Sequence, residues 1–341
     1  MEINMAITAK ELAKKLNLSQ TAVSMALNNK QGVSTATRQL VIKTAEEYGF
    51  DFTKLKHKDE NGGTVYMIFY KAHNAILSYT PIFNELYEGA KAELSPLGFS
   101  VRVVQFSERT DNLDTLFSDL RVGKCSGIIL VGTEISRSAC KEFIDLGFPL
   151  VLLDSYFESL DVTSVGINNS RGAYAATDFL INLTGTQPGY LKSSYRIPNF
   201  TARQEGYFAA IKENGMSRSR SIVHQLSPEI EDAMADMLDI IDEGASLAKC
   251  YFADNDILAI GAIKALKLRG YKIPEDIAVI GFDNITEGRI IEPALTTMDV
   301  PRKYIGKTAA KLLSDIIDMK SIHPQKVEIS TSMIKRLSHS R

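Results

Sequence analysis

Beyond residue 63, short apolar runs alternate with longer segments whose apolar residues recur at helical spacing. The first runs are VYMIFY (65–70), VRVVQF (101–106), GIILVG (127–132) and PLVLLD (149–154). From Ser170 the alternation restarts, with strands expected near 221–225, 249–253 and 277–282. Strands that alternate with helices indicate parallel sheets. The pattern predicts an α/β fold with two similar lobes, and a ligand cleft beyond the carboxyl ends of the strands of both.

The first 50 residues follow a different pattern, which predicts three short helices. Thr8 and Glu11 form a capping box for the first helix, and Asn17 suits the tight turn that ends it. Ser19 can cap a second helix, and Ser34 can cap a third. Two helices joined by a short turn and braced by a third are typical of helix-turn-helix DNA-binding domains. A small helical oligomerisation module would have the same pattern.

Charge is distributed unevenly along the 341 residues. Residues 1–58 hold nine Lys and Arg against five Asp and Glu, whereas the remainder holds 30 against 36. A basic head on an acidic body indicates a polyanionic partner for the head. No apolar run approaches membrane-spanning length, and the N-terminus does not resemble a signal peptide. The three scattered cysteines are expected to be reduced, so we expect a cytoplasmic protein with no membrane partner.

The second helix of the head is the expected recognition helix, and its exposed positions are Gln20, Thr21, Ser24 and Met25. Glutamine can pair with adenine, small hydroxyl side chains suit phosphates, and methyl groups suit the thymine methyl. At the start of the third helix, Ser34, Thr37 and Arg38 could add phosphate contacts.

The stretch TAKELAKKLNLSQTAVSMALNNKQGVSTATRQLVIKTAEEYGF (8–50) resembles the head of the lactose/galactose repressor (LacI/GalR) family of bacterial transcription regulators. Residues 250–285 and PALTTMDVP (293–301) are similar to segments of the second lobe in that family. The resemblance implies an all-α helix-turn-helix head and a two-lobe core like that of periplasmic binding proteins. It also implies a homodimer that binds a roughly palindromic double-stranded operator and responds to a small molecule, such as a sugar or sugar phosphate.

With this resemblance, the expected DNA-binding residues are Thr8, Ser19, Gln20, Thr21, Ala22, Ser24, Met25, Asn28, Ser34, Thr37 and Arg38. Met25 stands where many members carry a base-contacting arginine, so the operator sequence should differ from theirs. The hinge also departs from the family pattern, because its usual Pro-Asn and Ala-Arg pairs are absent. Leu55 could replace the missing minor-groove leucine only if the register shifts.

The expected domains are a head at 1–51, a hinge at 52–63 and a core at 64–341. Within the core, the family pattern implies a first lobe of about 64–165 and 298–325. The second lobe would then comprise about 166–297 and 326–341. The chain should cross between the lobes near 165–168, 295–298 and 323–327.

Polar residues at the ends of the expected strands are candidate ligand contacts: Asp154, Asn255 and Asp283. Charge-assisted hydrogen bonds from such groups suit a sugar's hydroxyls. The segment TARQEGY places Arg203 at a position that binds ligand hydroxyls in the family, and the resemblance favours Arg203 and Asp283 most. An Asp just after a strand can instead be the N-cap of the following helix, and this alternative applies most to Asp256.

The first strand ends with Tyr70, Lys71 and His73, which should line the same ligand cleft. Phe282 could be an apolar wall of that cleft or a core residue. Lys71 could indicate an anionic ligand or be a solvated lysine.

Enzyme motifs are not supported by the sequence. GKT at 306–308 lacks the glycine of a phosphate loop, since Pro301 occupies that position. The five histidines have no metal-ligand spacing, so no catalytic residue, metal or cofactor is predicted. We therefore expect a ligand-responsive DNA-binding regulator, a repressor of a carbohydrate-utilisation operon that an inducer releases. A solute-binding protein of transport type and a two-lobe enzyme are the alternatives, and the sequence does not distinguish inducer from corepressor.

Overall fold

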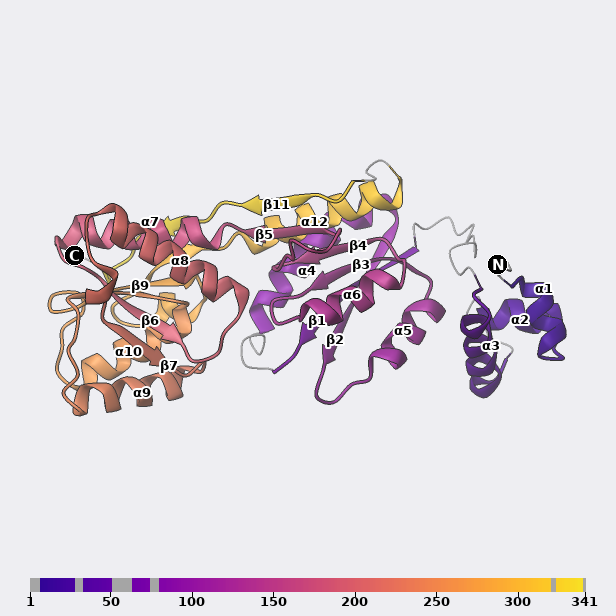
Figure 1. Cartoon of the computed structure of the whole chain (residues 1–341), viewed down its shortest axis with the longest axis horizontal. Helices are drawn as coiled ribbons and strands as arrows, with labels where there is room; N and C mark the ends of the chain where they lie inside the picture. The colour runs from indigo at the N-terminus through magenta and orange to yellow at the C-terminus, as the bar shows by residue number, and fades with distance from the viewer. Residues whose placement is uncertain (1–6, 28–32, 51–62, 74–79, 320–322, 340–341) are drawn as a thin grey trace.

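The computed structural model describes residues 7–27, 33–50, 63–73, 80–319 and 323–339. A small helical head, a first lobe and a second lobe follow one another along the long axis of the molecule (Figure 1). Each lobe contains one six-stranded sheet. The predicted fold class, an all-α head followed by a two-lobe α/β core with parallel sheets, is confirmed.

The head consists of α1 (Ala9–Lys15), α2 (Gln20–Leu27) and α3 (Thr35–Glu47). Thr8 and Glu11 form the predicted capping box, and Asn17 has a φ of 52° in the turn before α2. Apolar side chains from all three helices form a separate core: Leu12, Ala13, Val23, Ala26, Leu27, Val41 and Ala45. Because this core is small, the caps and the tight turn contribute a large share of the head's stability.

The sheet of the first lobe has the strand order β11-β5-β4-β3-β1-β2 and is parallel throughout. Its strands are β1 (Gly63–Lys71), β2 (Phe99–Ser107), β3 (Cys125–Val131), β4 (Leu150–Leu153), β5 (Thr163–Ile167) and β11 (Lys326–Ile329). One face is covered by α4 (Thr80–Leu94) and α12 (Arg302–Ile317), and the other by α5 (Leu113–Val122) and α6 (Arg137–Asp145). A single 3-10 turn (Ser95–Leu97) joins α4 to β2.

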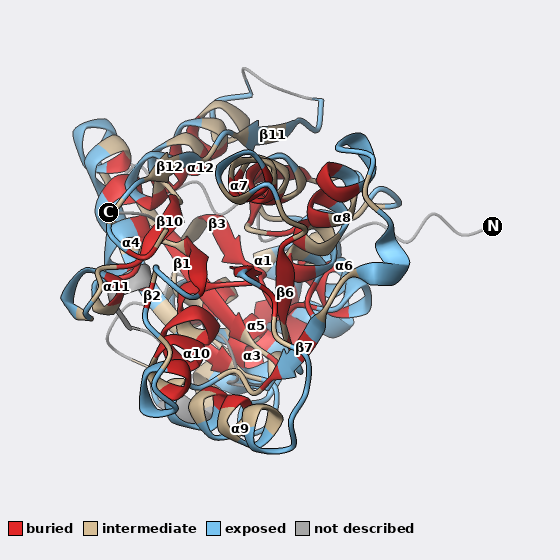
Figure 2. Ribbon diagram, turned by 90° about the vertical axis from the view of Figure 1, so that its left-hand side faces the viewer, coloured by how far each residue is buried: buried red, intermediate tan, exposed pale blue. Residues whose placement is uncertain are grey.

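The sheet of the second lobe has the order β12-β10-β9-β8-β6-β7, with only β12 antiparallel to its neighbour. Its strands are β6 (Gly189–Ser193), β7 (Val223–Leu226), β8 (Cys250–Ala253), β9 (Ala278–Asp283), β10 (Thr296–Asp299) and β12 (Ser332–Ile334). One face packs on α7 (Asn169–Thr184) and α8 (Pro198–Glu213), the other on α9 (Ile230–Asp242) and α10 (Asp256–Leu268). The short elements are a 3-10 turn (Arg218–Arg220) and α11 (Glu287–Ile290). Figure 2 shows buried strands enclosed by helices whose outer faces are exposed.

Three segments connect the lobes, and two of them differ from the sequence-based boundaries. The first lies between β5 and α7, as expected near 165–168. The second follows β10, because residues 296–299 still pair with β9 in the second sheet. The third lies between β11 and β12, because residues 326–329 pair with β5 in the first lobe rather than starting the second. Strand pairing decides these boundaries, and hydrophobic pattern does not report it. Apart from Gly63 at the start of β1, the expected hinge lies outside the described residues.

Candidate functional site

The head presents one polar face of α2. Val23 is fully buried in the head core, whereas Gln20, Thr21 and Ser24 are exposed. Ala22 and Met25 are half-buried at the edge of this face. The exposed and half-buried positions are five of the residues predicted to bind DNA.

Three other predicted DNA-binding residues have hydroxyl groups that cap helices. The Ser19 hydroxyl accepts from the backbone N–H of Ala22 at 3.0 Å. The Ser34 hydroxyl accepts from the backbone N–H of Thr37 at 3.1 Å. Thr8 caps α1 in the same way. All three caps are exposed, and an exposed cap leaves further lone pairs and neighbouring N–H groups for a phosphate.

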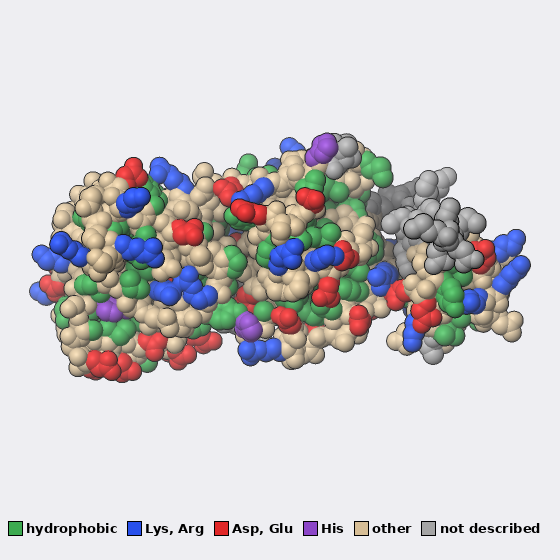
Figure 3. Space-filling view, viewed as in Figure 1, with side chains coloured by type: hydrophobic (Ala, Val, Ile, Leu, Met, Phe, Trp, Pro, Cys, Tyr) green, Lys and Arg blue, Asp and Glu red, His purple; other side chains and the backbone are tan. Residues whose placement is uncertain are grey.

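Thr37 and Arg38 are half-buried at the start of α3, and Asn28 lies outside the described residues. Figure 3 shows Lys and Arg side chains at the outer end of the head, while Asp and Glu gather over α9 at the far end of the molecule. The head is therefore the end of the chain suited to a polyanion.

Arg203 is the central residue of the site between the lobes. It lies in α8 and is only 4% exposed. Its guanidinium donates to Asn169 Oδ1 at 2.8 Å, to the Asp254 carbonyl at 2.6 Å and to Asp283 Oδ1 at 3.1 Å. The guanidinium carbon also lies 3.7 Å from the centre of the Phe282 ring. This planar group is thus held rigidly at the lobe junction, oriented by bonds from three sides.

A cavity of about 70 Å³ adjoins this guanidinium, and we call it the inner cavity. Both lobes line it: Phe83, Leu86, Val131, Thr133, Leu153, Asp154, Ile167, Ile197, Asn199, Phe200, Arg203, Asp283, Val300, Arg302 and Ile305. Its lining combines aromatic and aliphatic walls with a few charged and amide groups, which is the chemistry of a small-molecule site. The structure therefore brings Arg203, Asp283 and Asp154 together.

Asp154 follows β4 and Asp283 ends β9, and both have positive φ angles, of 63° and 106°. Asp154 accepts from the Thr133 hydroxyl at 2.6 Å and, across the lobe junction, from Asn199 Nδ2 at 3.1 Å. Burial raises the pKa of Asp154 above its ordinary value, and these hydrogen bonds only partly oppose that shift. A carboxyl with a raised pKa can offer a ligand either an acceptor or a donor.

Four other predicted ligand residues do not line the inner cavity. Tyr70 packs between Phe106 and Phe143 on the face of β1 opposite the cavity, since side chains alternate along a strand. Asn255 accepts from the Leu258 N–H at 3.1 Å as the N-cap of α10. Lys71 donates to Gln105 at 3.2 Å and lies over the ring of Phe83, behind the cavity wall. Phe282 is fully buried beneath Arg203 and orients it instead.

Several residues of the site were not anticipated. Asp254 and Asn169 hold Arg203, Thr133 holds Asp154, and Arg302 donates to the Asp283 carbonyl at 2.5 Å. Asp254 and Thr133 follow β8 and β3, so the rule that found Asp154 could have found them. Arg302 and Asn199 start helices that approach the site from outside the sheets, and no local signal marks them.

A second contact spans the lobes at the end of β1. The rings of His73 and Tyr195 meet in a T-shaped arrangement with centres 5.3 Å apart, and Arg109 Nη2 lies 3.4 Å from His73 Nδ1. The N–H groups of Ala72 and His73 both donate to Glu134 at 2.9 Å, which fixes this segment to the first lobe. His73 therefore lies at the junction of the lobes, where its partner in the second lobe is an aromatic ring.

Asp256 is fully buried beneath the site, and we expect it to make the stability of the protein depend on pH. Burial raises the pKa of Asp256 to about 8, although Thr297 and the Ile285 N–H donate to its carboxylate. In the unfolded chain this group ionises near pH ~4. Over the interval between these values the folded state binds more protons than the unfolded state, so stability must fall as pH rises. We expect Asp256→Asn to flatten this decline, measured by urea unfolding of the core at several pH values. The matched exposed variant Asp239→Asn should keep the wild-type slope, and equal slopes for all three proteins would contradict the assignment.

Comparisons with known proteins agree with this architecture. Residues 161–339 match the model of the periplasmic binding protein-like domain family. The chain is 28% identical to the NTD biosynthesis operon regulator NtdR of Bacillus subtilis, covering 97% of this chain and 99% of the relative. It is 26% identical to the transcriptional repressor PurR of Mannheimia succiniciproducens, covering 97% and 98%.

Among solved structures, a LacI family transcriptional regulator from Enterococcus faecium with bound ribose is 27% identical. Its TM-score is 0.69, and the match covers 81% of this chain and 98% of that one. Both curated relatives named above are transcription regulators, so the transport alternative is not favoured. Within the described ranges, no helix combines the length and apolarity needed to cross a bilayer. The chain contains the periplasmic binding protein-like domain and belongs to the lactose/galactose repressor (LacI/GalR) family of ligand-responsive, DNA-binding transcription regulators.

Proposed function

We propose that the chain represses a carbohydrate-utilisation operon and releases its operator DNA when a sugar or sugar phosphate binds between the lobes. The observation that carries this proposal is the Arg203 guanidinium, buried at the inner cavity and held there by Asn169, Asp254 and Asp283. A fixed planar donor beside carboxylates and an aromatic wall suits the hydroxyls and apolar ring face of a sugar. The relative from Enterococcus faecium binds ribose, which supports this ligand class.

The effector acts by changing which arrangement of the lobes is favoured. Asn199 binds Asp154 across the junction, and His73 contacts Tyr195 across it. A ligand that contacts both lobes binds one arrangement better than another, and only that difference in affinity can shift the equilibrium. In a dimer, the lobe arrangement sets the separation of the two heads and hence operator affinity.

On the DNA side, α2 enters a major groove and the exposed residues Gln20, Thr21 and Ser24 approach base edges. The capped N-termini of α1, α2 and α3 contact phosphates. The absence of charge on α2 itself allows a close approach, with cations supplied by its neighbours.

Homodimerisation uses an apolar groove of about 630 Å³ on the second lobe, between α9, α10 and α11. Ile290 and Leu268 at this groove are 74% and 63% exposed. Charged side chains of both signs surround it, including Glu231, Lys264 and Glu287. An apolar centre with a mixed charged rim is the composition of a self-complementary interface.

We expect Ile290→Glu to convert the dimer to a monomer, because a carboxylate would be desolvated at the centre of the interface. Light scattering after gel filtration measures this change of mass. Losing the second head should weaken operator binding by about 100-fold or more. Leu183→Glu, on the exposed surface of α7, is the control and should stay dimeric. A variant at position 290 that remains dimeric would place the interface elsewhere.

The proposed function is tested directly by DNA binding. The full-length protein is used to select sites from random duplex DNA, and its affinity for the selected site is measured by fluorescence anisotropy at several salt concentrations. We expect a roughly palindromic site and an affinity that falls steeply with salt, as phosphate contacts require. Sugars and sugar phosphates are then screened for release of that DNA. Absence of duplex binding at low salt would refute the regulator assignment.

A further inference from the structure

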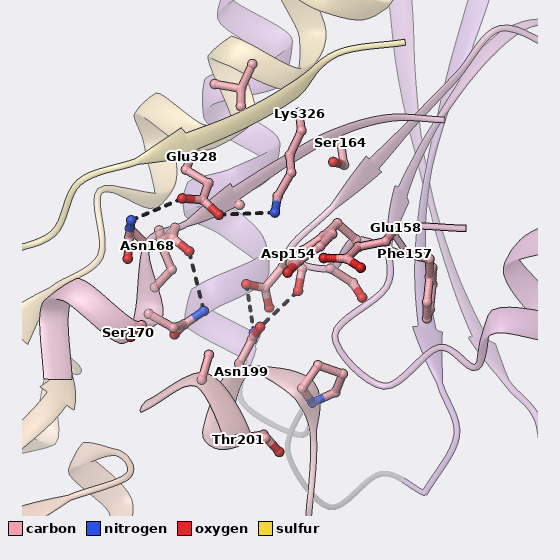
Figure 4. A pocket seen from close by; sticks show the side chains of 18 of the residues that line it. Asp154, Phe157, Glu158, Ser164, Asn168, Ser170, Asn199, Thr201, Lys326 and Glu328 are labelled. Carbon is pink, nitrogen blue, oxygen red and sulfur yellow. Dashed lines mark hydrogen bonds and ion pairs between the residues drawn. The ribbon is translucent and has the colours of Figure 1, made fainter. Parts of the chain in front are cut away.

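A second and larger pocket lies on the other side of the Asp154–Asn199 contact from the inner cavity. It encloses about 660 Å³ and is formed by the loop 154–159, by β5 and β11 and by the first turns of α7 and α8. We call it the outer pocket. Its volume lies within the range of ~300–1,000 Å³ that small-molecule sites occupy, whereas the inner cavity of about 70 Å³ would admit a sugar only after the lobes move apart. Both lobes contribute to its walls, as Figure 4 shows for Lys326 of β11 and Asn199 of α8.

The outer pocket is chemically distinct from the inner cavity. Arg203, Asp283 and Arg302 line only the inner cavity, and the two spaces share just Asp154, Asn199 and Ile167. The Asn199 amide donates to both the carboxylate and the carbonyl of Asp154, at 3.1 and 3.3 Å, and this pair forms the partition between them. A ligand in the outer pocket would therefore not meet the buried guanidinium.

Carboxylates dominate the walls of the outer pocket. Three glutamates line it, Glu158, Glu205 and Glu328, against one cation, Lys326. The N-termini of α7 and α8 add roughly half a positive charge each. The three glutamates thus outweigh the lysine and the helix ends by about one charge, before Asp154 is counted. These charged side chains are exposed, and the negative potential that they create attracts a cation.

Two of these carboxylates are free to bind a cation. Glu158 and Glu205 have neither a hydrogen bond nor an ion pair within the described part of the chain, whereas Glu328 accepts from Asn168 at 3.0 Å and lies 3.4 Å from Lys326. In addition, Ser155 lines the pocket, is 7% exposed and has a hydroxyl with no hydrogen-bond partner among the described residues. An unpaired buried hydroxyl is uncommon in folded proteins, and a ligand would supply the missing partner.

The chain's own ammonium group already occupies part of this environment. Lys326 Nζ lies 3.2 Å from the centre of the Tyr156 ring, next to Glu328. An aromatic face beside a carboxylate attracts an ammonium by both cation–π and ionic interactions. The outer pocket is also lined by serine and threonine hydroxyls, including those of Ser164, Ser170 and Thr201, which can exchange hydrogen bonds with the hydroxyl groups of a ligand.

We propose that the outer pocket is a second ligand site, separate from the inner cavity, which binds a small molecule carrying both an ammonium group and several hydroxyl groups, such as an amino sugar or aminocyclitol. The ammonium binds between Glu205 and Glu158, and the hydroxyls bind the polar wall. Because both lobes form the pocket, its occupant also biases the lobe arrangement, independently of the inner cavity.

The test measures binding to the full-length protein by isothermal titration calorimetry at low salt. D-Glucosamine and 2-deoxystreptamine are the cationic probes, and N-acetyl-D-glucosamine and myo-inositol are their neutral counterparts. We expect the cationic probes to bind at least tenfold more tightly, since a charge-assisted hydrogen bond contributes about that much. Glu205→Gln should remove this preference. Glu213→Gln, an exposed glutamate at the other end of α8, is the matched control and should retain it.

Lys326→Gln should change the affinity for the cationic probes in the opposite direction to Glu205→Gln. Removing the resident ammonium frees Tyr156 and Glu328, so affinity for the cationic probes should rise by about threefold or more. Damage to the pocket could only lower it. The proposal is overturned if no probe binds at ~10 mM, if neutral probes bind as tightly, or if Glu205→Gln has no effect. None of these outcomes bears on DNA binding or on the inner cavity, which are measured separately.

Discussion

Arg203→Lys is expected to yield a repressor that binds its operator normally but no longer releases it. The lysine keeps a positive charge but cannot reproduce three donors aimed at Asn169, Asp254 and Asp283. Three of the five guanidinium N–H groups bind the protein, which leaves two for a ligand. Each charge-assisted bond contributes about 1.5–3 kcal/mol, so losing both ligand bonds should weaken effector binding by about 100-fold or more. The measurement is release of fluorescent operator DNA as the effector identified by screening is titrated.

Arg196→Lys is the matched control for this variant. Arg196 precedes the same helix and is exposed, and among the described residues it donates only to Thr201 and Gln204. It should respond to effector within a factor of about two of the wild type. If Arg203→Lys were induced at the wild-type effector concentration, the effector would have to bind outside the inner cavity. If it lost operator binding as well, Arg203 would be needed for the fold of the core rather than for sensing.

Val23→Asp is expected to abolish operator binding while leaving effector binding intact. Val23 is fully buried in the core of the head, where a carboxylate would be desolvated at a cost of several kcal/mol. The head has three short helices and one small apolar cluster, so it should unfold. The cores of the lobes share no residue with that cluster and should be unaffected. Anisotropy measures the loss of DNA binding, and calorimetry measures effector affinity.

Gln39→Asp separates unfolding of the head from simple charge repulsion by DNA. Gln39 is an exposed residue of α3, so this variant adds the same charge to the same domain without burying it. We expect at most a severalfold reduction in its DNA affinity. Equal losses for both variants would mean that charge, not folding, explains the effect. Loss of effector binding in Val23→Asp would mean that the head and the core fold as one unit.

The sequence alone predicted the elements whose signals are local. The capping box of Thr8 and Glu11, the left-handed Asn17 and the caps Ser19 and Ser34 all form as expected, since each depends on neighbouring backbone groups. Buried strands of four or more apolar residues were also found. β6 (Gly189–Ser193) was missed, because Tyr190 and Leu191 are its only large apolar residues and its burial depends on neighbouring strands.

In the candidate site, too, the sequence predicted what local signals mark and missed what depends on the tertiary structure. Asp154 and Asp283 were singled out because each lies at the carboxyl end of a strand, and the structure brings the ends of the two sheets together at the inner cavity. That rule identifies where a residue lies along a strand but not which face it occupies, so it included Tyr70, which packs on the opposite side. It also could not separate Asn255, whose side chain caps α10, from Asp254, whose carbonyl holds Arg203.

The sequence by itself determined the family, the helix-turn-helix head and the two α/β lobes, because these depend on local spacing and motifs, and the family resemblance made Arg203 and Asp283 the leading candidates for ligand contacts. Only the tertiary structure decided that β11 belongs to the first lobe and that Asn199 bridges to Asp154. It also decided that a separate acidic outer pocket lies beyond that bridge. Each of these features joins segments 45 or more residues apart, and their proximity arises from strand pairing and lobe packing, which no short stretch of sequence encodes.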